Sequence, residues 1–273
     1  MTDTPIVPSW TMLDFRIEQD QAELLAELLW QLGVVAIEEL PVDEDWVVLR
    51  TSMGEDFTDV QELIQQSFPS VLVSIAYVEK SVADTWRHHA VPTWVTEEVV
   101  LCPAWLPAPS VQHCIFIEPA DTFGLGNHPT TVLALRLGLR HCDRHSKVFD
   151  FGCGSGVLGI AAAKILQCES FMFDIAHNAE QVVRMNDTAN HTHTFWQSDI
   201  RNILVDFVFA NILAPVLKSE SKIIQDATGE SGRIVLSGMR DEQVADVLLS
   251  YQHCHEIERE SLNGWTAVVL QKN

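Results

Sequence analysis

The middle of the chain reads Lys147-Val148-Phe149-Asp150-Phe151-Gly152-Cys153-Gly154-Ser155-Gly156, and a small-residue segment, 157–163, follows it. The apolar first half predicts a short buried strand, the glycines predict a tight turn, and the segment after them predicts a helix. Because glycine has no Cβ, such a turn lets the backbone come close to a ligand. The start of the helix offers unpaired N–H groups to the same ligand. We therefore expect a ligand site at a strand end of an open α/β sheet.

A carboxylate follows the next predicted strand. Asp174 ends the apolar run 170–173, about twenty residues beyond the glycine turn, where it can accept hydrogen bonds from both hydroxyls of a ribose. This indicates an adenosine ligand. Gly154-x-Gly156-x-x-Gly159 formally fits the dinucleotide fingerprint. With Asp150 and Gly152 in front, the stretch is also similar to the first motif of class I S-adenosylmethionine (SAM) methyltransferases. The turn alone leaves NAD and SAM as alternatives.

Composition limits the class of protein. With 273 residues, 47% of them hydrophobic, the chain can build one large or two modest domains with packed cores. It has no apolar run of the roughly 18 residues that a membrane span requires, and its N-terminus lacks a secretory signal pattern. Six scattered cysteines without Cys-x-x-Cys indicate reduced thiols, and the His/Cys clusters at 141–145 and 253–255 lack a second ligand pair for a metal. We expect a cytoplasmic protein with no metal and no membrane segment.

The formal net charge of −21 indicates which classes of partner the protein attracts or repels. Such a charge repels phosphate backbones, so we expect no direct binding of nucleic acid. It attracts a basic protein and speeds the encounter at low salt. The alternative is that the acidity serves solubility alone.

The order of predicted elements divides the chain into three parts. Residues 1–78 follow the order β-α-β-β-α-β, with strands at 10–17, 33–40, 45–50 and 71–78 and helices at 20–32 and 55–67. This is the ferredoxin-like α+β arrangement, and we interpret it as a substrate-recognition domain. Residues 79–95 form a predicted linker. Residues 96–273 alternate strands and helices and close on strands at 256–260 and 265–271, which predicts a parallel sheet with an antiparallel edge hairpin.

Three further segments resemble one enzyme family. They are Asp121-Thr122-Phe123-Gly124-Leu125-Gly126-Asn127-His128-Pro129-Thr130-Thr131, Ala210-Asn211-Ile212-Leu213-Ala214-Pro215, and Leu236-Ser237-Gly238-Met239. With the glycine turn, the chain resembles the ribosomal protein L11 methyltransferases, the PrmA family, over nearly its whole length. The resemblance implies a class I SAM methyltransferase (Rossmann-like) catalytic domain at 96–273, with SAM as cofactor. It also implies methylation of lysine side chains or the N-terminal amine of the basic ribosomal protein L11.

The resemblance and the residue chemistry together give the site. We predict SAM contacts at Phe123, Thr131, Asp150, Gly152, Gly154, Gly156, Asp174 and Asn211, and a catalytic role for Asn211. The glycines would approach the methionine part, and the Phe123 ring would face the adenosine or the cationic sulfonium. The side-chain carbonyl of Asn211, at the end of an apolar strand, can orient the acceptor amine. Structural alternatives stay open: a mere tight turn, a helix cap at Thr130 or Thr131, core packing of Phe123, and a structural turn or a proton acceptor at His128.

Two positions depart from the family pattern. Leu125 stands where threonine is usual, and Ala176 stands where aspartate is usual. Because of these departures, two alternative functions stay open. The protein is a related methyltransferase with another protein or small-molecule substrate, or a catalytically weak SAM-binding interaction protein. We expect a monomer in each case.

Overall fold

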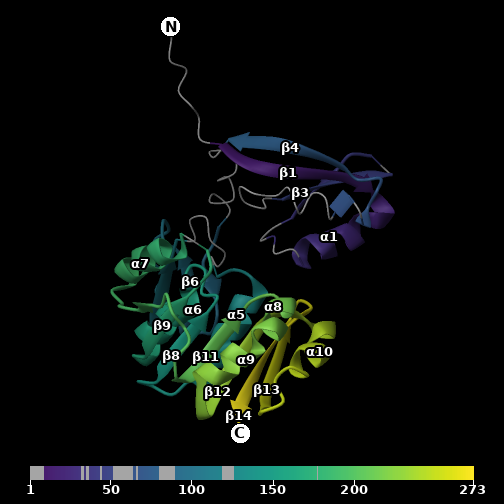
Figure 1. Cartoon of the computed structure of the whole chain (residues 1–273). Coiled ribbons are helices and arrows are strands. Elements are labelled where there is room, and N and C mark those ends of the chain that lie inside the picture. Colours follow the sequence, from purple (N-terminus) through teal and green to yellow (C-terminus); the bar gives the residue numbers. More distant parts are fainter. Residues whose placement is uncertain are drawn as a thin grey trace. The chain divides into compact units, whose positions relative to one another are not determined.

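The computed structural model describes residues 9–31, 34, 37–43, 45–51, 64–65, 67–79, 90–118, 126–176 and 178–273. The chain splits into two compact units, Met1–Ala90 and Val91–Asn273 (Figure 1). Every helix among the described residues is too short or too polar to cross a bilayer.

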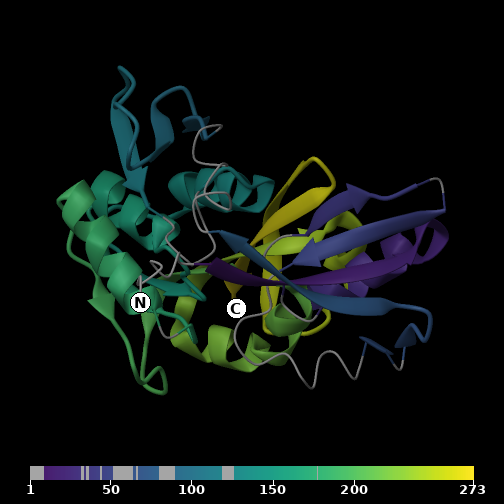
Figure 2. The ribbon, with the colours of Figure 1, turned by 90° about the horizontal axis from the view of Figure 1, so that it is seen from above.

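Four described strands of the first unit form an antiparallel sheet. They are β1 (Ser9–Glu18), β2 (Glu38–Pro41), β3 (Trp46–Thr51) and β4 (Leu72–Glu79), in the order β2-β3-β1-β4. The two long strands β1 and β4 run side by side (Figure 2). Alternate residues of β1 and β3 point to one face, where Leu25 and Leu29 of α1 (Ala22–Gln31) complete the core. The strand order is the one that a ferredoxin-like domain requires. The predicted helix at 55–67 lies largely outside the described residues, so that assignment stays a prediction.

The second unit is built on a mixed sheet of seven described strands. In the order in which they lie, these are β10 (Phe195–Trp196), β9 (Glu169–Phe173), β8 (Lys147–Phe151), β11 (Val205–Asn211), β12 (Thr228–Arg240), β14 (Trp265–Lys272) and β13 (Cys254–Leu262). The first five are parallel, and β14 pairs antiparallel with both β12 and β13. The predicted parallel sheet with an antiparallel edge hairpin is therefore confirmed.

Helices cover both faces of this sheet. They are α5 (Pro129–His141), α6 (Val157–Ala161), which continues as a π-helical turn at Ala162–Leu166, α7 (Ala179–Asn190), α8 (Ala214–Ser219), α9 (Ser221–Ala227) and α10 (Val244–Leu248). Alternation along β11 sends Phe207 and Phe209 into one apolar cluster, with α5 and α6. It sends Val208 and Ala210 into the other, with α8 to α10. Burial on both faces explains why the central strands are continuously apolar.

A small sheet leads into the first helix of this unit. It contains β5 (Thr93–Trp94), β6 (Val99–Pro103) and β7 (His113–Ile117), and β6 and β7 are parallel. Leu101 and Ile115 pack in the same apolar cluster as α5 and α6. In the sequence, the segment that resembles the family motif follows β7 and leads to α5.

Candidate functional site

Most of the predicted site residues that the structure describes lie at the carboxyl edge of the parallel strands. Phe151 of β8 pairs with Phe173 of β9 on one side and with Ala210 of β11 on the other. Asn211, the last residue of β11, pairs with Ser237 of β12. This register brings the glycine turn, Asp174 and Asn211 to one edge of the sheet, the place where ligands bind in open α/β sheets.

The turn after β8 is a backbone structure that only glycine accepts at its key positions. Gly152, Gly154 and Gly156 have φ of 73°, 53° and 80°, in the left-handed region. The N–H groups of Gly152 and Cys153 donate to the carbonyl of Phe173 at 2.8 and 3.0 Å. A Cβ on Gly152 would collide with the Ile212 side chain. The turn is thus held against both neighbouring strand ends; Gly152 and Gly154 are half-buried, and Gly156 is buried.

Asp174 is fixed by two backbone groups. Its Oδ2 accepts from the Gly154 N–H and its Oδ1 from the Ala176 N–H, both at 2.8 Å. A carboxylate has about four acceptor positions, so each oxygen can accept a further bond from a ribose hydroxyl. Ala176, one of the two departures from the family pattern, contributes only its main-chain N–H to Asp174, and almost any residue would supply that group.

Asp150 lies in β8, one residue before its end. Its side chain is 1% exposed, and its Oδ2 accepts from the Gly159 N–H of α6 at 2.9 Å. Burial raises the pKa of this carboxyl to about 7; the Gly159 bond lowers it and the charge of Asp174 raises it. Asp150 therefore secures the start of α6 against the turn. Its predicted contact with SAM stays a prediction.

Asn211 carries an unusual buried acceptor. Its Nδ2 donates to the Thr131 hydroxyl at 3.3 Å, and Thr131, in the first turn of α5, is fully buried. Its Oδ1 is buried and accepts no hydrogen bond from any described residue. An unpaired buried acceptor costs free energy, and such atoms are rare in folded proteins. A ligand N–H would satisfy this oxygen, as the predicted role of Asn211 requires.

His128 caps the N-terminus of α5. The sequence offers Thr130 or Thr131 as candidates for this cap. Its Nδ1 accepts from the Thr130 N–H at 3.4 Å and lies 2.8 Å from the Thr130 hydroxyl. The ring meets Trp265 edge-on, with centroids 4.9 Å apart. Burial, and then the charge of Arg240, lower the pKa of His128, which favours the neutral ring. These contacts fit the structural alternative for His128.

Ser237 and Gly238 support the loop after Asn211. The sequence motif that contains them predicts no separate role for either residue. The Ser237 hydroxyl donates to the Thr130 carbonyl at 3.0 Å and joins β12 to α5. Gly238 has φ of 89°, and a Cβ there would collide with the Ile212 main chain. Their position at the end of β12, beside Asn211, is the signal that could have identified them.

The structure does not describe two of the positions that the sequence singles out. Phe123 and Leu125 lie outside the described residues. Within the described part of the chain, no group of three or more His, Cys, Asp or Glu side chains is placed to hold a metal ion.

Comparison with known proteins gives a consistent result. The model of the ribosomal protein L11 methyltransferase (PrmA) family matches residues 9–273. A ribosomal protein L11 methyltransferase of Nitrosococcus oceani is 28% identical over 272 residues, which cover 89% of this chain and 92% of that protein. One from a Synechococcus species is 27% identical and covers 97% of this chain and 98% of its own. A solved structure, the ribosomal protein L11 methylase of Lactobacillus delbrueckii subsp. bulgaricus, shares the fold with a TM-score of 0.59 and 23% identity, over 65% of this chain and 95% of that one.

Proposed function

Because the chain belongs to the ribosomal protein L11 methyltransferase (PrmA) family, we propose that it transfers methyl groups from SAM to amines of ribosomal protein L11. The acceptors would be lysine side chains, the N-terminal amine, or both. The observation that carries this proposal is the buried Oδ1 of Asn211, which accepts no hydrogen bond from the described residues and lies at the same sheet edge as the glycine turn and Asp174.

The residues at this edge fit SAM. Gly152 and Gly154 of the turn are only half-buried and would face the methionine part, and Asp174 has acceptor positions for the two ribose hydroxyls. Asp150 would act from the end of β8, through its bond to the Gly159 N–H of α6. Phe123 would cover the adenosine or the sulfonium. SAM supplies a methyl group that is already activated on a positively charged sulfur.

The protein's own task is alignment and desolvation. An acceptor amine must be neutral to attack, whereas free lysine has a pKa of about 10.4. Asn211 Oδ1 can accept an N–H of the amine and thereby fix the direction of its lone pair. Removal of water around the amine, next to a positive charge, disfavours the ammonium form. The proton that the amine carries beforehand is released to solvent, since the neutral His128 serves as the cap of α5.

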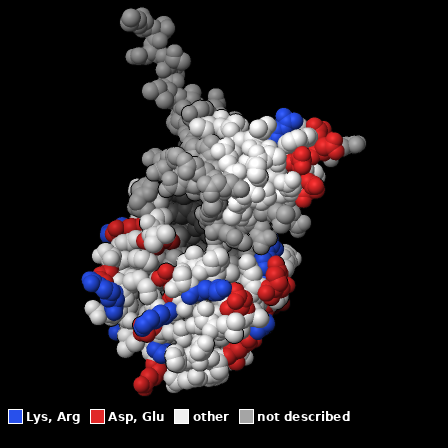
Figure 3. Space-filling model, turned by 45° about the vertical axis from the view of Figure 1, so that its right-hand side comes forward, with Lys and Arg blue, Asp and Glu red and all other residues white. Residues whose placement is uncertain are grey.

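The first unit would supply substrate recognition. Residues 1–78 contain no ligand motif, and the acidic chain as a whole attracts a basic protein such as a ribosomal protein. On the face drawn in Figure 3, acidic and basic side chains of the second unit lie intermixed. We therefore assign the attraction to the net charge of −21 rather than to a patch on that face.

The test is mass spectrometry of purified ribosomal protein L11 after incubation with SAM and either the parent chain or Asn211→Ala. We expect the parent to add methyl groups and the variant to turn over about a hundredfold more slowly, because a misaligned transfer costs about that factor. SAM affinity should fall less, since the turn and Asp174 remain. Turnover of the parent should rise with pH as the acceptor loses its proton. Full turnover by Asn211→Ala would leave Asn211 as a turn residue only. SAM binding without methylation of L11 would indicate another substrate.

A further inference from the structure

Helix α7 presents two buried asparagines one turn apart, Asn186 and Asn190, with 0% and 2% exposure. Asn190 accepts from the Phe116 N–H at 2.9 Å and donates to the Phe116 carbonyl at 2.6 Å. Asn186 does the same at Glu118, with both distances 2.9 Å. Residues two apart on a strand direct their N–H and C=O groups to the same side. The two amides therefore pair with β7 and its C-terminal extension as a neighbouring strand would.

Asn186 makes one contact that Asn190 lacks. Its Nδ2 also donates to the carbonyl of Ser155 at 2.9 Å. Ser155 is fully buried and lies in the glycine turn, between Gly154 and Gly156. Asn190 instead donates to the Asn186 carbonyl at 2.9 Å and accepts from Lys164. Only the first of these two asparagines reaches the turn.

Glu118 lies immediately before the segment that holds Phe123. The chain passes directly from Glu118 into 119–125, the segment that holds Phe123. A single buried amide thus joins the main chain of the glycine turn to the residue from which that segment starts. In the proposed function, both the glycine turn and the segment that holds Phe123 contact SAM.

We propose that Asn186 is a positioning residue for SAM, and this rests on the proposed function. By bonding Ser155 and Glu118 at the same time, it sets the spacing between the glycine turn and the start of the Phe123 segment. It acts through these two main-chain positions and does not contact the reacting atoms. Among the described residues, Asn190 joins the same strand and helix but makes no hydrogen bond to the glycine turn. A comparison of the two residues therefore distinguishes positioning of SAM from general stability of the fold.

The experiment compares Asn186→Asp with Asn190→Asp in the full chain. Aspartate keeps the shape and the acceptor oxygen toward β7, but replaces the donor nitrogen with a second acceptor. Each variant loses two donated bonds: Asn186→Asp to Glu118 and Ser155, and Asn190→Asp to Phe116 and Asn186. Alanine at each position forms a second matched pair without a buried charge. The readouts are the Kd of SAM by calorimetry, the KM for SAM against kcat, and the Tm.

We expect similar losses of Tm in the alanine pair and a smaller loss for Asn190→Asp than for Asn186→Asp, because Lys164 already donates to Asn190. The Kd for SAM should be at least tenfold weaker for Asn186→Asp and within about twofold of the parent for Asn190→Asp. The KM for SAM should rise more than kcat falls. Equal effects of the two substitutions on SAM affinity, in both the aspartate and the alanine pair, would overturn this inference while leaving the proposed function intact. A parent chain that binds no SAM would overturn both.

Discussion

At the scale of single residues, Asp174 offers the most direct test of the cofactor site. Its oxygens are already oriented by the N–H groups of Gly154 and Ala176, so a bound ribose would meet a preformed acceptor. Asp174→Ala should weaken SAM binding by about 1.5–3 kcal/mol, the usual contribution of a hydrogen bond to a charged group. Calorimetry measures this directly, and an unchanged Kd would exclude Asp174 from the site.

Asp150 gives the ligand-free protein a pH dependence of its own. Its pKa is about 7 in the folded chain, chiefly through burial, against about 3.9 for an ordinary aspartate. Between these values the unfolded chain has released a proton that the folded chain still holds, so folded stability falls as pH rises from about 4 to about 7. Above that range the effect is constant.

Substitution of Asp150 by asparagine should remove this decline while keeping an acceptor for the Gly159 N–H. Thermal unfolding of parent and variant at a series of pH values from about 4 to 8 provides the measurement. Asp226→Asn, which changes an exposed carboxylate, serves as the control. Parallel curves for parent and Asp150→Asn would contradict the pKa assigned to Asp150.

The sequence predicted the candidate site residues because glycines and strand-end polar groups have few other uses. It could not show that Asp150 accepts from the Gly159 N–H of α6, since that depends on which apolar cluster lies behind β8. Nor could it assign the cap of α5 to His128, because serine, threonine, aspartate and asparagine are the usual capping residues. The unpaired Oδ1 of Asn211 is visible only in the folded chain.

At the scale of elements, the pattern predicted the strands of the sheet well and one helix poorly. The sequence over 214–225 predicts one helix, but the structure has two, α8 and α9, divided at Glu220. The hydroxyls of Ser219 and Ser221 donate to carbonyls three residues earlier, Val216 and Lys218, and so compete with the helical backbone bonds. Apolar periodicity does not register such local competition.

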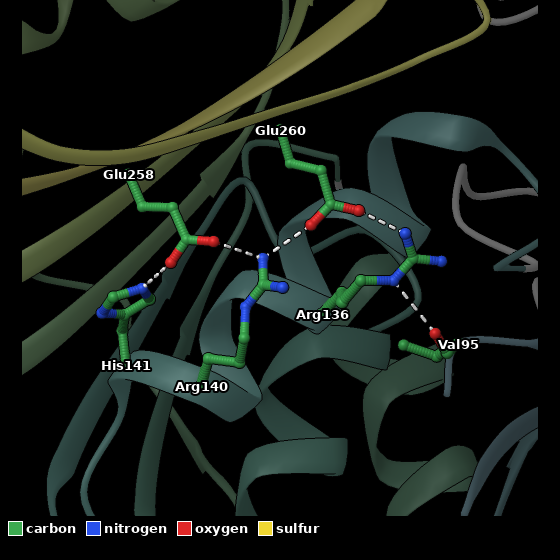
Figure 4. Close-up of polar contacts among 6 residues, drawn as sticks. All are labelled: Val95, Arg136, Arg140, His141, Glu258 and Glu260. Carbon is green, nitrogen blue, oxygen red and sulfur yellow. Dashed lines mark hydrogen bonds and ion pairs between the residues drawn. The ribbon is translucent and has the colours of Figure 1, made fainter. Parts of the chain in front are cut away.

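A chain of ion pairs joins α5 to the edge strand β13 (Figure 4). Glu260 accepts from Arg136 and Arg140, and Glu258 contacts Arg140 and His141. Arg136 also donates to the Val95 carbonyl at 3.1 Å. Burial alone would raise the pKa of Glu260, but the hydrogen bonds from Arg136 and Arg140 lower it overall. The stabilisation is therefore present at neutral pH and is lost as pH falls through this lowered pKa.

Glu260→Gln should cost about 1–2 kcal/mol, somewhat less than a fully buried charged hydrogen bond, because the Glu260 side chain is 22% exposed. In a domain of this size that corresponds to a Tm lower by roughly 2–8 °C. Asp226→Asn breaks an exposed pair with Lys222 and should stay within about 0.5 kcal/mol. Equal Tm values for Glu260→Gln and the parent would show that these ion pairs contribute no stability.

At the scale of the whole chain, the two units have separate apolar cores. The described core residues of the first unit form one cluster, and those of the second unit form two clusters on the faces of its sheet. The sequence placed residues 79–95 as a linker, and the unit boundary lies between Ala90 and Val91. The division of labour between the units stays a prediction, because the family motifs mark only the second.

A fragment that begins at Val91 should therefore fold and bind SAM with the affinity of the full chain. It should lose methylation of L11, because the proposed recognition part is absent. Calorimetry with SAM and mass spectrometry of L11 give the two readouts, and the full chain is the control. If the fragment methylates L11 as fast as the full chain does, residues 1–78 have another purpose.

The strand order of the second unit has a consequence for self-association. An open sheet edge exposes main-chain groups that can template a strand from another molecule. Here one edge is β10, which is only two residues long. The other is β13, whose sequence Cys-His-Glu-Ile-Glu-Arg-Glu-Ser-Leu carries three glutamates and one arginine and whose register shifts between Glu256 and Glu258. A short edge on one side and a charged, irregular edge on the other both oppose strand addition, so the continuously apolar strands between them are shielded from cross-β aggregation.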